Sequence, residues 1–327
     1  MARKPTVTSL ARDLGVSRQT ISNAINNPHR VHPETLERVL DGIRRSGYVT
    51  SRAGRQLRTR KADAIGFRLY PTYDGINGNI LDRFLHSITL EAEKFGYSIV
   101  IFSADNDDRE VEHLVAMKNS GAIDAAILAA SSVGDARPDE LFDKGVPAIV
   151  FGRPWGRETS SIPWIDVDGR AGTREVTKLL RDAHHQKIGW IGWSPEHGVG
   201  ADRRSGYEDA MGDSLDSDLC LLCPDDTAAG RDAAHVLYGR GATAVVCASD
   251  TLALGAVSSG LYDISSIVGF DDTPVAQALR LNSVAQPIDD IARHCIKQLL
   301  KQVNEEEPIR ETLLPATAQI RQKVIKL

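Results

Sequence analysis

Residues 8–26, TSLARDLGVSRQTISNAIN, constrain the fold of this chain more than any other stretch. Apolar residues recur at helical spacing on both sides of a central glycine, which predicts two short helices joined by a tight turn. Gly15 suits that turn because glycine adopts a positive φ without steric cost. Ala11 is small enough to let a second helix cross closely, and Ile21 supplies the apolar side of that helix. The pattern predicts a helix-turn-helix, which lays its second helix in the DNA major groove.

The polar residues of this stretch predict a surface that contacts DNA. Ser17 is expected to cap the second helix, because its side-chain oxygen can accept a backbone N–H of the first turn. The residues expected to point away from the apolar side are Arg18, Gln19, Ser22 and Asn23. Thr8 and Ser17 carry hydroxyls that suit bonds to phosphates.

The charge distribution favours the same interpretation. Residues 1–62 hold 13 Lys and Arg against 4 Asp and Glu, a net charge of +9. The whole chain carries −5, so residues 63–327 carry −14. A basic head on an acidic body is expected when only one part of a protein meets phosphates. The alternative is a solvated basic tail, but the apolar periodicity within residues 7–48 argues against it, because a tail needs no core.

Length and composition limit the class of protein. A chain of 327 residues with 42% hydrophobic residues is expected to form two or three compact soluble units. The N-terminus shows no signal-peptide core, and no run approaches the roughly 20 apolar residues of a membrane span, so a cytoplasmic protein is expected. Cys220 and Cys223 form a CxxC without a second ligand pair, which favours unpaired thiols over zinc. Neither a metal nor a cofactor is expected.

The head is expected to continue beyond the second helix. Pro33 suits the start of a third helix and Gly47 its end, which predicts a DNA-binding domain over residues 1–50. Residues 51–63, SRAGRQLRTRKAD, are open to two interpretations. They form either a flexible basic linker or a hinge helix whose arginines, Arg52 and Arg55 among them, contact phosphates while Leu57 inserts between base pairs from the minor groove.

From residue 64 onward the pattern alternates between strand and helix. β-rich runs occupy 64–70, 98–104, 124–130 and 147–152, followed by a second series at 187–193, 219–222, 243–249 and 266–272. Amphipathic stretches separate these runs. Two such series in tandem predict an α/β body of two doubly wound parallel sheets. Because ligands of these sheets bind beyond the carboxyl ends of the strands, two facing lobes are expected to form a binding cleft.

The ordered motifs of the chain resemble those of the lactose-repressor/galactose-repressor family of bacterial transcription regulators. The motifs are GVSRQTISNAIN in the head, GYVTSRAGRQLRTRKADAIGF in the linker, and IDVDGRAG, DRRSGYEDAM and IVGFDDTPVA in the body. The resemblance implies a periplasmic-binding-protein-like core over 64–327. Its N-subdomain spans about 64–166 plus 288–304, and its C-subdomain about 167–287 plus 305–327. It also implies a homodimer or higher oligomer on a pseudo-palindromic operator, with a small-molecule effector in the cleft.

The resemblance assigns DNA contacts residue by residue. Arg18, Gln19 and Asn23 match the family's base-reading positions, Leu57 its minor-groove leucine, and His29 a position near backbone contacts. Asn23 departs from the arginine that family members often carry. Asparagine pairs most naturally with adenine and arginine with guanine, so the preferred operator is expected to differ.

The resemblance also assigns an effector site. Arg203 matches an anchor with a planar fork of donors, Asp271 an acceptor of ligand hydroxyls, and Ser249 a polar contact. Trp193 either stacks on a sugar ring or belongs to the core. Asp168 either caps a helix or faces the cleft, and Asp250 is expected to cap the helix that follows it.

Four further aromatic residues are weaker candidates for the cleft. Tyr70 and Tyr73 follow the first strand of the body, while Trp155 and Trp164 belong either to the cleft or to its rim.

Together these features predict a repressor whose affinity for DNA is switched by an effector. A sugar or polyol is the leading candidate for that effector, and a nucleoside or purine is the alternative. A solute-binding protein and an enzyme with an appended DNA module are rival classes. The sequence shows no nucleophile elbow and no paired-carboxylate motif, so no catalytic activity is expected.

Overall fold

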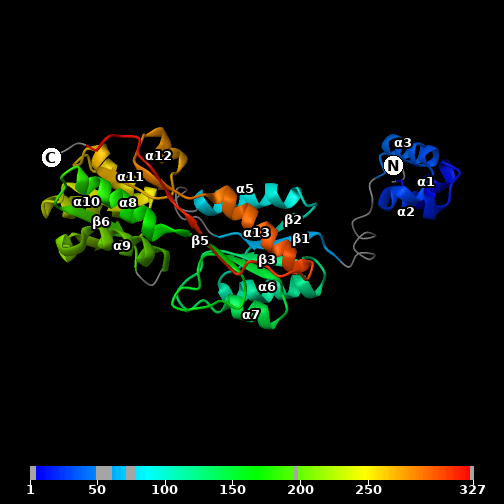
Figure 1. Ribbon diagram of the computed structural model, residues 1–327, viewed down its shortest axis with the longest axis horizontal. Coiled ribbons are helices and arrows are strands. Elements are labelled where there is room, and N and C mark those ends of the chain that lie inside the picture. The colour runs from blue at the N-terminus through cyan, green and yellow to red at the C-terminus, as the bar shows by residue number, and fades with distance from the viewer. Residues whose placement is uncertain (1–4, 49–60, 71–78, 195–197, 325–327) are drawn as a thin grey trace. The chain divides into compact units, whose positions relative to one another are not determined.

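The computed structural model describes residues 5–48, 61–70, 79–194 and 198–324 (Figure 1). The chain divides into two compact units, Met1–Lys61 and Ala62–Leu327, which we call the head and the core unit. Among the described residues no helix has both the length and the apolar character needed to cross a membrane.

The head is a small helical unit with its own apolar core. Its elements are α1 (Val7–Asp13), α2 (Arg18–Asn26), a 3-10 turn (Pro28–Arg30) and α3 (Pro33–Ser46). Gly15 has a φ of 64° between α1 and α2, and Gly47 ends α3 with a φ of 65°. Ser17 caps α2 by accepting the backbone N–H of Thr20. The predicted helix-turn-helix and third helix are therefore confirmed. The residues buried between the helices are Leu10, Ala11, Ile21, Ala24 and Val39.

The first lobe of the core unit is built on a six-stranded parallel sheet. Its order is β11-β5-β4-β3-β1-β2. The strands are β1 (Ala64–Arg68), β2 (Ser98–Phe102), β3 (Ala125–Leu128), β4 (Ala148–Phe151), β5 (Trp164–Asp168) and β11 (Glu311–Pro315). Figure 1 shows helices on both faces of this sheet. One pair is α5 (Asn79–Glu93) with α13 (Ile288–Val303), and the other is α6 (Asp107–Asn119) with α7 (Arg137–Asp143).

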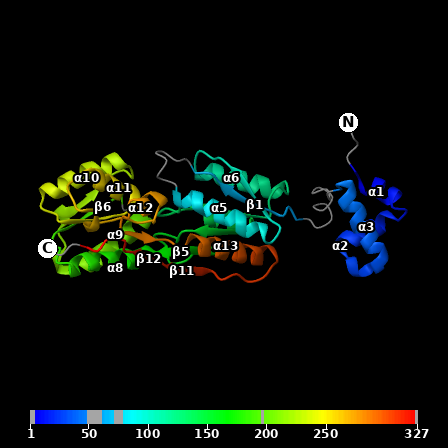
Figure 2. The ribbon, with the colours of Figure 1, turned by 90° about the horizontal axis from the view of Figure 1, so that it is seen from above.

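The second lobe repeats the plan with a four-stranded parallel sheet of order β7-β6-β8-β9. The strands are β6 (Ile188–Gly192), β7 (Cys220–Leu222), β8 (Ala244–Cys247) and β9 (Ile267–Val268). Figure 2 shows helices on both sides of this sheet, and they pack in pairs. These pairs are α8 (Gly169–Asp182) with α9 (Gly198–Met211), and α10 (Thr227–Gly239) with α11 (Asp250–Ser258). A short helix α12 (Pro274–Ala278) precedes β10 (Ser283–Ala285), which pairs antiparallel with β12 (Thr317–Gln319).

The connections between the lobes correct one expected boundary. The described chain passes from one lobe to the other after β5, between β10 and α13, and between β11 and β12. Residues 305–327 were expected in the second lobe. Instead β11 pairs with β5 in register Glu311↔Trp164 to Pro315↔Asp168, so the change of lobe falls after Pro315. This edge strand alternates exposed and half-buried residues, and it lacks the continuous apolar run that identified the central strands.

Candidate functional site

Helix α2 presents the polar face that the sequence predicted. Ile21 and Ala24 are buried against the rest of the head, whereas Arg18 and Gln19 are exposed. The side chain of Gln19 donates its Nε2–H to Oδ1 of Asn23, at 3.1 Å, one turn along the helix. Ser22 is half-buried, like Asn23. An exposed helix with adjacent amide side chains has the donors and acceptors that base edges require.

The remaining candidate DNA contacts divide into two groups. Thr8 on α1 and His29 in the 3-10 turn are exposed, and the hydroxyl of Ser17 is exposed while it also caps α2. Arg52, Arg55 and Leu57 lie outside the described residues, so their contacts with phosphate and base pairs remain predictions.

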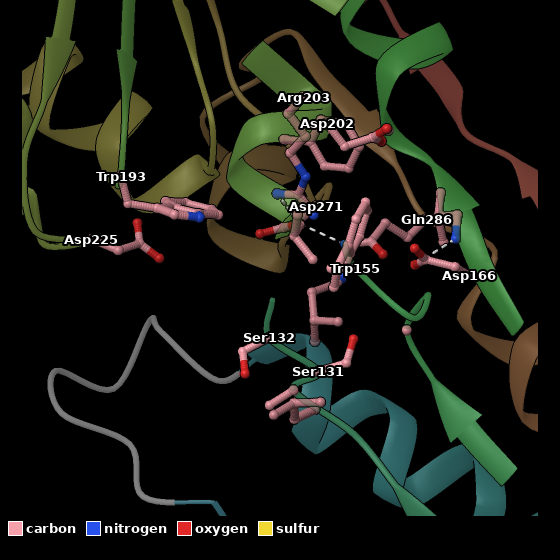
Figure 3. Close-up of a pocket in the computed structure, with 18 of the residues that line it drawn as sticks. Ser131, Ser132, Trp155, Asp166, Trp193, Asp202, Arg203, Asp225, Asp271 and Gln286 are labelled. Carbon is pink, nitrogen blue, oxygen red and sulfur yellow. Dashed lines mark hydrogen bonds and ion pairs between the residues drawn. The ribbon is translucent and has the colours of Figure 1, made fainter. Parts of the chain in front are cut away.

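A cavity of about 930 Å³ lies between the two lobes of the core unit. Its size falls within the roughly 300–1,000 Å³ of small-molecule sites. In Figure 3, Trp193 and Asp225 stand on one side and Trp155, Asp166 and Gln286 on the other. Most of the lining residues follow the carboxyl ends of strands in both lobes, where doubly wound sheets bind ligands. A cleft between the lobes was predicted, and the structure contains one.

Arg203 and Asp271 meet in this cavity as the sequence analysis expected. Nη1 of Arg203 lies 3.3 Å from Oδ1 of Asp271 and donates to the carbonyl of Ala248 at 2.6 Å. Its guanidinium lies 3.6 Å from the centre of the Phe270 ring. Asp271 also accepts a hydrogen bond from Nε2 of Gln286, at 2.7 Å. Burial raises the pKa of Asp271, and the guanidinium of Arg203 opposes that shift.

Trp193 lines the cavity and also packs against the core of the second lobe. Its position depends on Gly200, because a Cβ there would lie only 2.4 Å from the indole nitrogen. The guanidinium of Arg203 is 5.7 Å from the Trp193 ring centre. An aromatic face, a guanidinium and a carboxylate thus converge in one part of the cavity.

A second polar group, centred on Arg153, lines the cavity and was not predicted from the sequence. Its Nε donates to Asp166 at 2.8 Å, and its Nη2 donates to Asp202 and to the carbonyl of Val167, each at 3.0 Å. Arg153 and Asp166 belong to the first lobe and Asp202 to the second, so this ion pair joins the lobes across the cavity. Arg153 follows the predicted strand 147–152, and its position at a strand's carboxyl end was the available signal.

Trp155 was expected either in the cleft or at its rim. It lines the cavity beside this group. The guanidinium of Arg153 is 4.6 Å from its ring centre. The ring packs on the backbone of the second lobe, where a Cβ at Gly198 would fall 2.1 Å from it. Trp164, the other alternative, packs against the core of the first lobe instead.

Ser249 and Asp250 have roles different from those expected. Ser249 is buried and caps α11 by accepting the backbone N–H of Leu252, and its hydroxyl donates to Asp225. Ser249 therefore contacts Asp225, and Asp225 is the residue of this pair that lines the cavity. Asp250 was expected to be the cap, but it lies one residue inside the helix. Its carboxylate accepts from the backbone N–H of Thr273 at 2.7 Å and from the hydroxyl of Ser283 at 2.6 Å.

Two further candidates have structural partners that explain them. Asp168 caps α8 by accepting the backbone N–H of Ala171 at 2.8 Å, which favours the capping alternative. The hydroxyl of Tyr70 donates to the carbonyl of Ala129 at 2.8 Å and accepts from Nη1 of Arg137 at 3.1 Å. Tyr70 is thus part of a buried network in the first lobe. Tyr73 lies outside the described residues.

A DNA-reading head joined to a two-lobed core with an interlobe cavity is the architecture of a ligand-responsive DNA-binding regulator. Comparisons with known protein families and structures agree with this architecture. Residues 81–311 match the model of periplasmic binding proteins and the sugar binding domain of the LacI family, and residues 6–51 match the bacterial regulatory proteins of the lacI family. The chain belongs to the lacI family of bacterial regulatory proteins, and it is a DNA-binding transcriptional regulator.

Relatives and solved structures resemble the chain over most of its length. The transcriptional regulator AglR of Rhizobium meliloti is 32% identical over 81% of this chain and 78% of its own. A LacI-family regulatory protein from Chloroflexus aggregans, solved by crystallography, is 30% identical with a TM-score of 0.74, covering 80% of this chain and 98% of that one. A CelR–cellobiose complex is 24% identical with a TM-score of 0.70, covers 98% and 99% of the two chains, and shows the shared fold.

Proposed function

We propose that this regulator is a repressor whose affinity for its operator changes when a sugar or polyol binds in the interlobe cavity. The observation that carries the proposal is the convergence of Trp193, Arg203 and Asp271 in one cavity. An aromatic face suits the C–H groups of a sugar ring. A guanidinium donates to ring hydroxyl oxygens, and a carboxylate accepts from hydroxyls. The family's sugar binding domain supports the same class of ligand.

The switch acts through the relative position of the two lobes. Arg153 and Asp202 join the lobes beside the ligand cavity, so a ligand that contacts both lobes alters how they close. In a homodimer this motion changes the spacing of the two heads on a pseudo-palindromic operator. The coupling required is about 1–3 kcal/mol, or roughly 5–150-fold in affinity.

The surface of the first lobe supports the homodimer. Leu90 on α5 and Ile101 on the edge strand β2 are 62% and 50% exposed. Apolar side chains on an edge strand and a neighbouring helix suit a contact between two copies of the chain. We propose that the protein acts in the cytoplasm as this dimer and catalyses no reaction.

The first test follows the response to ligand. An operator is selected from genomic fragments, and its binding is measured with cellobiose, other sugars, polyols and nucleosides. Arg203→Lys keeps the charge but loses the planar fork, so we expect operator affinity close to that of the unmodified protein and a ligand response at least about tenfold weaker. An unchanged response in this variant removes Arg203 from the ligand site. A response to nucleosides alone would show that the effector is a nucleoside and not a sugar. Turnover of any ligand would show that the protein is an enzyme.

The second test concerns base reading by α2. Gln19→Ala removes an exposed amide that suits a base edge. We expect the preference for the selected operator over random DNA to fall by about 1–3 kcal/mol, with binding to random DNA nearly unchanged. Both affinities are measured at several salt concentrations. Equal losses on the two DNAs would show that Gln19 does not read bases.

A further inference from the structure

We infer that the interlobe cavity excludes anionic ligands and takes its sugar or polyol without a phosphate or carboxylate group. This inference rests on the proposed function of the cavity, and it names the charge class of the ligand. It is carried by the charges that line the cavity and by the partners of its guanidinium groups.

Carboxylates outnumber cations around the cavity. Among the described lining residues there are two cations, Arg153 and Arg203, and five acids: Asp107, Asp166, Asp202, Asp225 and Asp271. A cavity lined by one sign of charge attracts ligands of the opposite sign and repels those of its own.

Both lining guanidinium groups already have anionic partners. Arg153 is bonded to Asp166 and Asp202. Arg203 is paired with Asp271, and its Nη1 also donates to the carbonyl of Ala248. A phosphate bound at either guanidinium would lie beside the carboxylates that are already paired with it, and repulsion between these like charges opposes its binding.

The lining acid at the start of α6, Asp107, is also paired. Asp107 accepts from Nη1 of Arg68, and that guanidinium also bonds Glu110. Arg83 lies close enough to lower the pKa of Asp271, although burial outweighs it. Arg68 is therefore matched by acids of its own surroundings. Hydroxyl groups of an uncharged ligand, in contrast, donate to the carboxylates without disturbing any ion pair.

Cys223 gives a direct measure of the charge in the cavity. It lines the cavity and is half-buried, two residues before Asp225 in the sequence. Burial raises the pKa of its thiol to about 11, and the charges of Asp225 and Asp226 add to the shift. Because Cys223 lines the cavity, a thiol reagent that enters the cavity meets this sulfur, and the reagent's own charge affects how fast it reacts.

The experiment labels Cys223 in the full-length chain carrying Cys220→Ser, since Cys220 is the other half-buried thiol. Three methanethiosulfonates are compared: the cationic trimethylammonioethyl, the anionic sulfonatoethyl and the neutral methyl reagent. Each forms a mixed disulfide while sulfinate leaves, and mass spectrometry locates the label. The thiolate fraction is common to the three reagents, so it cancels from the rate ratios. The same ratios measured on glutathione provide the reference.

We expect the ratio of cationic to anionic rate to exceed that of glutathione by about tenfold or more. The excess shrinks at about 1 M salt, where the screening length falls to roughly 3 Å. Asp225→Asn lowers the ratio, whereas Asp182→Asn, at an exposed position on α8, leaves it unchanged. A ratio equal to that of glutathione, or an anionic reagent that reacts faster, overturns the inference.

A second arm compares ligands in pairs by calorimetry: glucose with glucose 6-phosphate, and cellobiose with its phosphate ester. We expect the phosphorylated member of a pair to bind at least about tenfold more weakly. Tighter binding of a phosphate ester overturns the inference. If no sugar of any kind binds, the proposed ligand class fails, while the labelling ratio at Cys223 still decides the charge of the cavity.

Discussion

At the scale of single residues, Asp250 holds the loop that carries Asp271. Asp271 and Asp272 have φ values of 105° and 50°, a conformation that side chains other than glycine rarely adopt. The carboxylate of Asp250 bonds the backbone N–H of Thr273 just beyond them and the hydroxyl of Ser283. Gly269 allows the close approach, because a Cβ there would lie 2.2 Å from Oδ1 of Asp250. A buried acid thus stabilises the strained turn at the cavity.

The stability of the core unit is expected to depend on this acid. Burial raises the pKa of Asp250 from its ordinary 3.8 to about 7, and the nearby charge of Asp271 adds to the shift. The folded chain therefore retains a proton that the unfolded chain releases between about pH 4 and pH 7. The resulting stabilisation is fully present below the unfolded pKa and is lost as the pH rises through about 7.

Asp250→Asn tests this dependence. The amide oxygen can accept the N–H of Thr273 while its NH₂ donates to Ser283, so the variant is expected to fold. Urea unfolding of the core unit between pH 4 and 8 should then show a smaller loss of stability with rising pH than in the unmodified protein. Asp182→Asn serves as the exposed control and should keep the original slope. Identical slopes for Asp250→Asn and the unmodified chain would contradict the assignment.

At the scale of elements, the helix pairs of the second lobe cross at glycines. A Cβ at Gly206 of α9 would lie 2.1 Å from the carbonyl oxygen of Arg170 in α8. A Cβ at Gly255 of α11 would lie 2.3 Å from the carbonyl oxygen of Thr227 in α10. Backbone cannot yield as a flexible side chain does, so these two crossings require glycine. The crossings fix α9 and α11, and these two helices carry Arg203 and Asp250.

Gly206→Ala is expected to destabilise the core unit by about 1–3 kcal/mol, because the added methyl group forces α8 and α9 apart. Gly239→Ala is the matched control, since that helical glycine has no atom within 4 Å of its ideal Cβ. The control should be neutral or stabilising by up to about 1 kcal/mol. Thermal unfolding of both variants measures the difference. Equal stability of the two variants would show that the crossing accommodates a side chain.

At the scale of the whole molecule, the chain consists of two units with separate apolar cores. Among the described residues, the head encloses five buried apolar residues, whereas the core unit encloses three large clusters. Small units bury a smaller fraction of their surface and are less stable. We therefore expect two thermal transitions in calorimetry, with the head unfolding at the lower temperature.

Ile21→Ala assigns the two transitions. Ile21 is fully buried in the head, and its truncation is expected to cost about 2–5 kcal/mol. Only the lower transition should shift. Leu40→Ala is the control within the same unit, because Leu40 is 38% exposed and its loss should move that transition much less. A shift of the upper transition in Ile21→Ala would mean that the two units unfold together.

Features that depend on neighbouring residues could be predicted from the amino-acid sequence alone. Helical spacing of apolar residues and the positive φ of Gly15 and Gly47 are local properties, so the helices α1, α2 and α3 were predictable. The alternation of apolar runs with amphipathic stretches likewise predicted two parallel sheets with a cleft between them. Arg203 and Asp271 were identified through the family motifs around them.

Contacts between residues that are distant in the chain become visible only in the folded structure. Arg153 and Asp202 are 49 residues apart, and Asp250 and Ser283 are 33 apart. Hydrogen-bond partners at such separations leave no periodic signal, so the ion pair between the lobes and the support of the Asp271 loop were not foreseen. The same reason explains why the role of Tyr70 was not foreseen. Its hydroxyl bonds the carbonyl of Ala129 and the guanidinium of Arg137, and both residues are distant from it in the chain. Local pattern predicts elements because backbone preferences act between neighbours, whereas a ligand site depends on packing that brings distant side chains together.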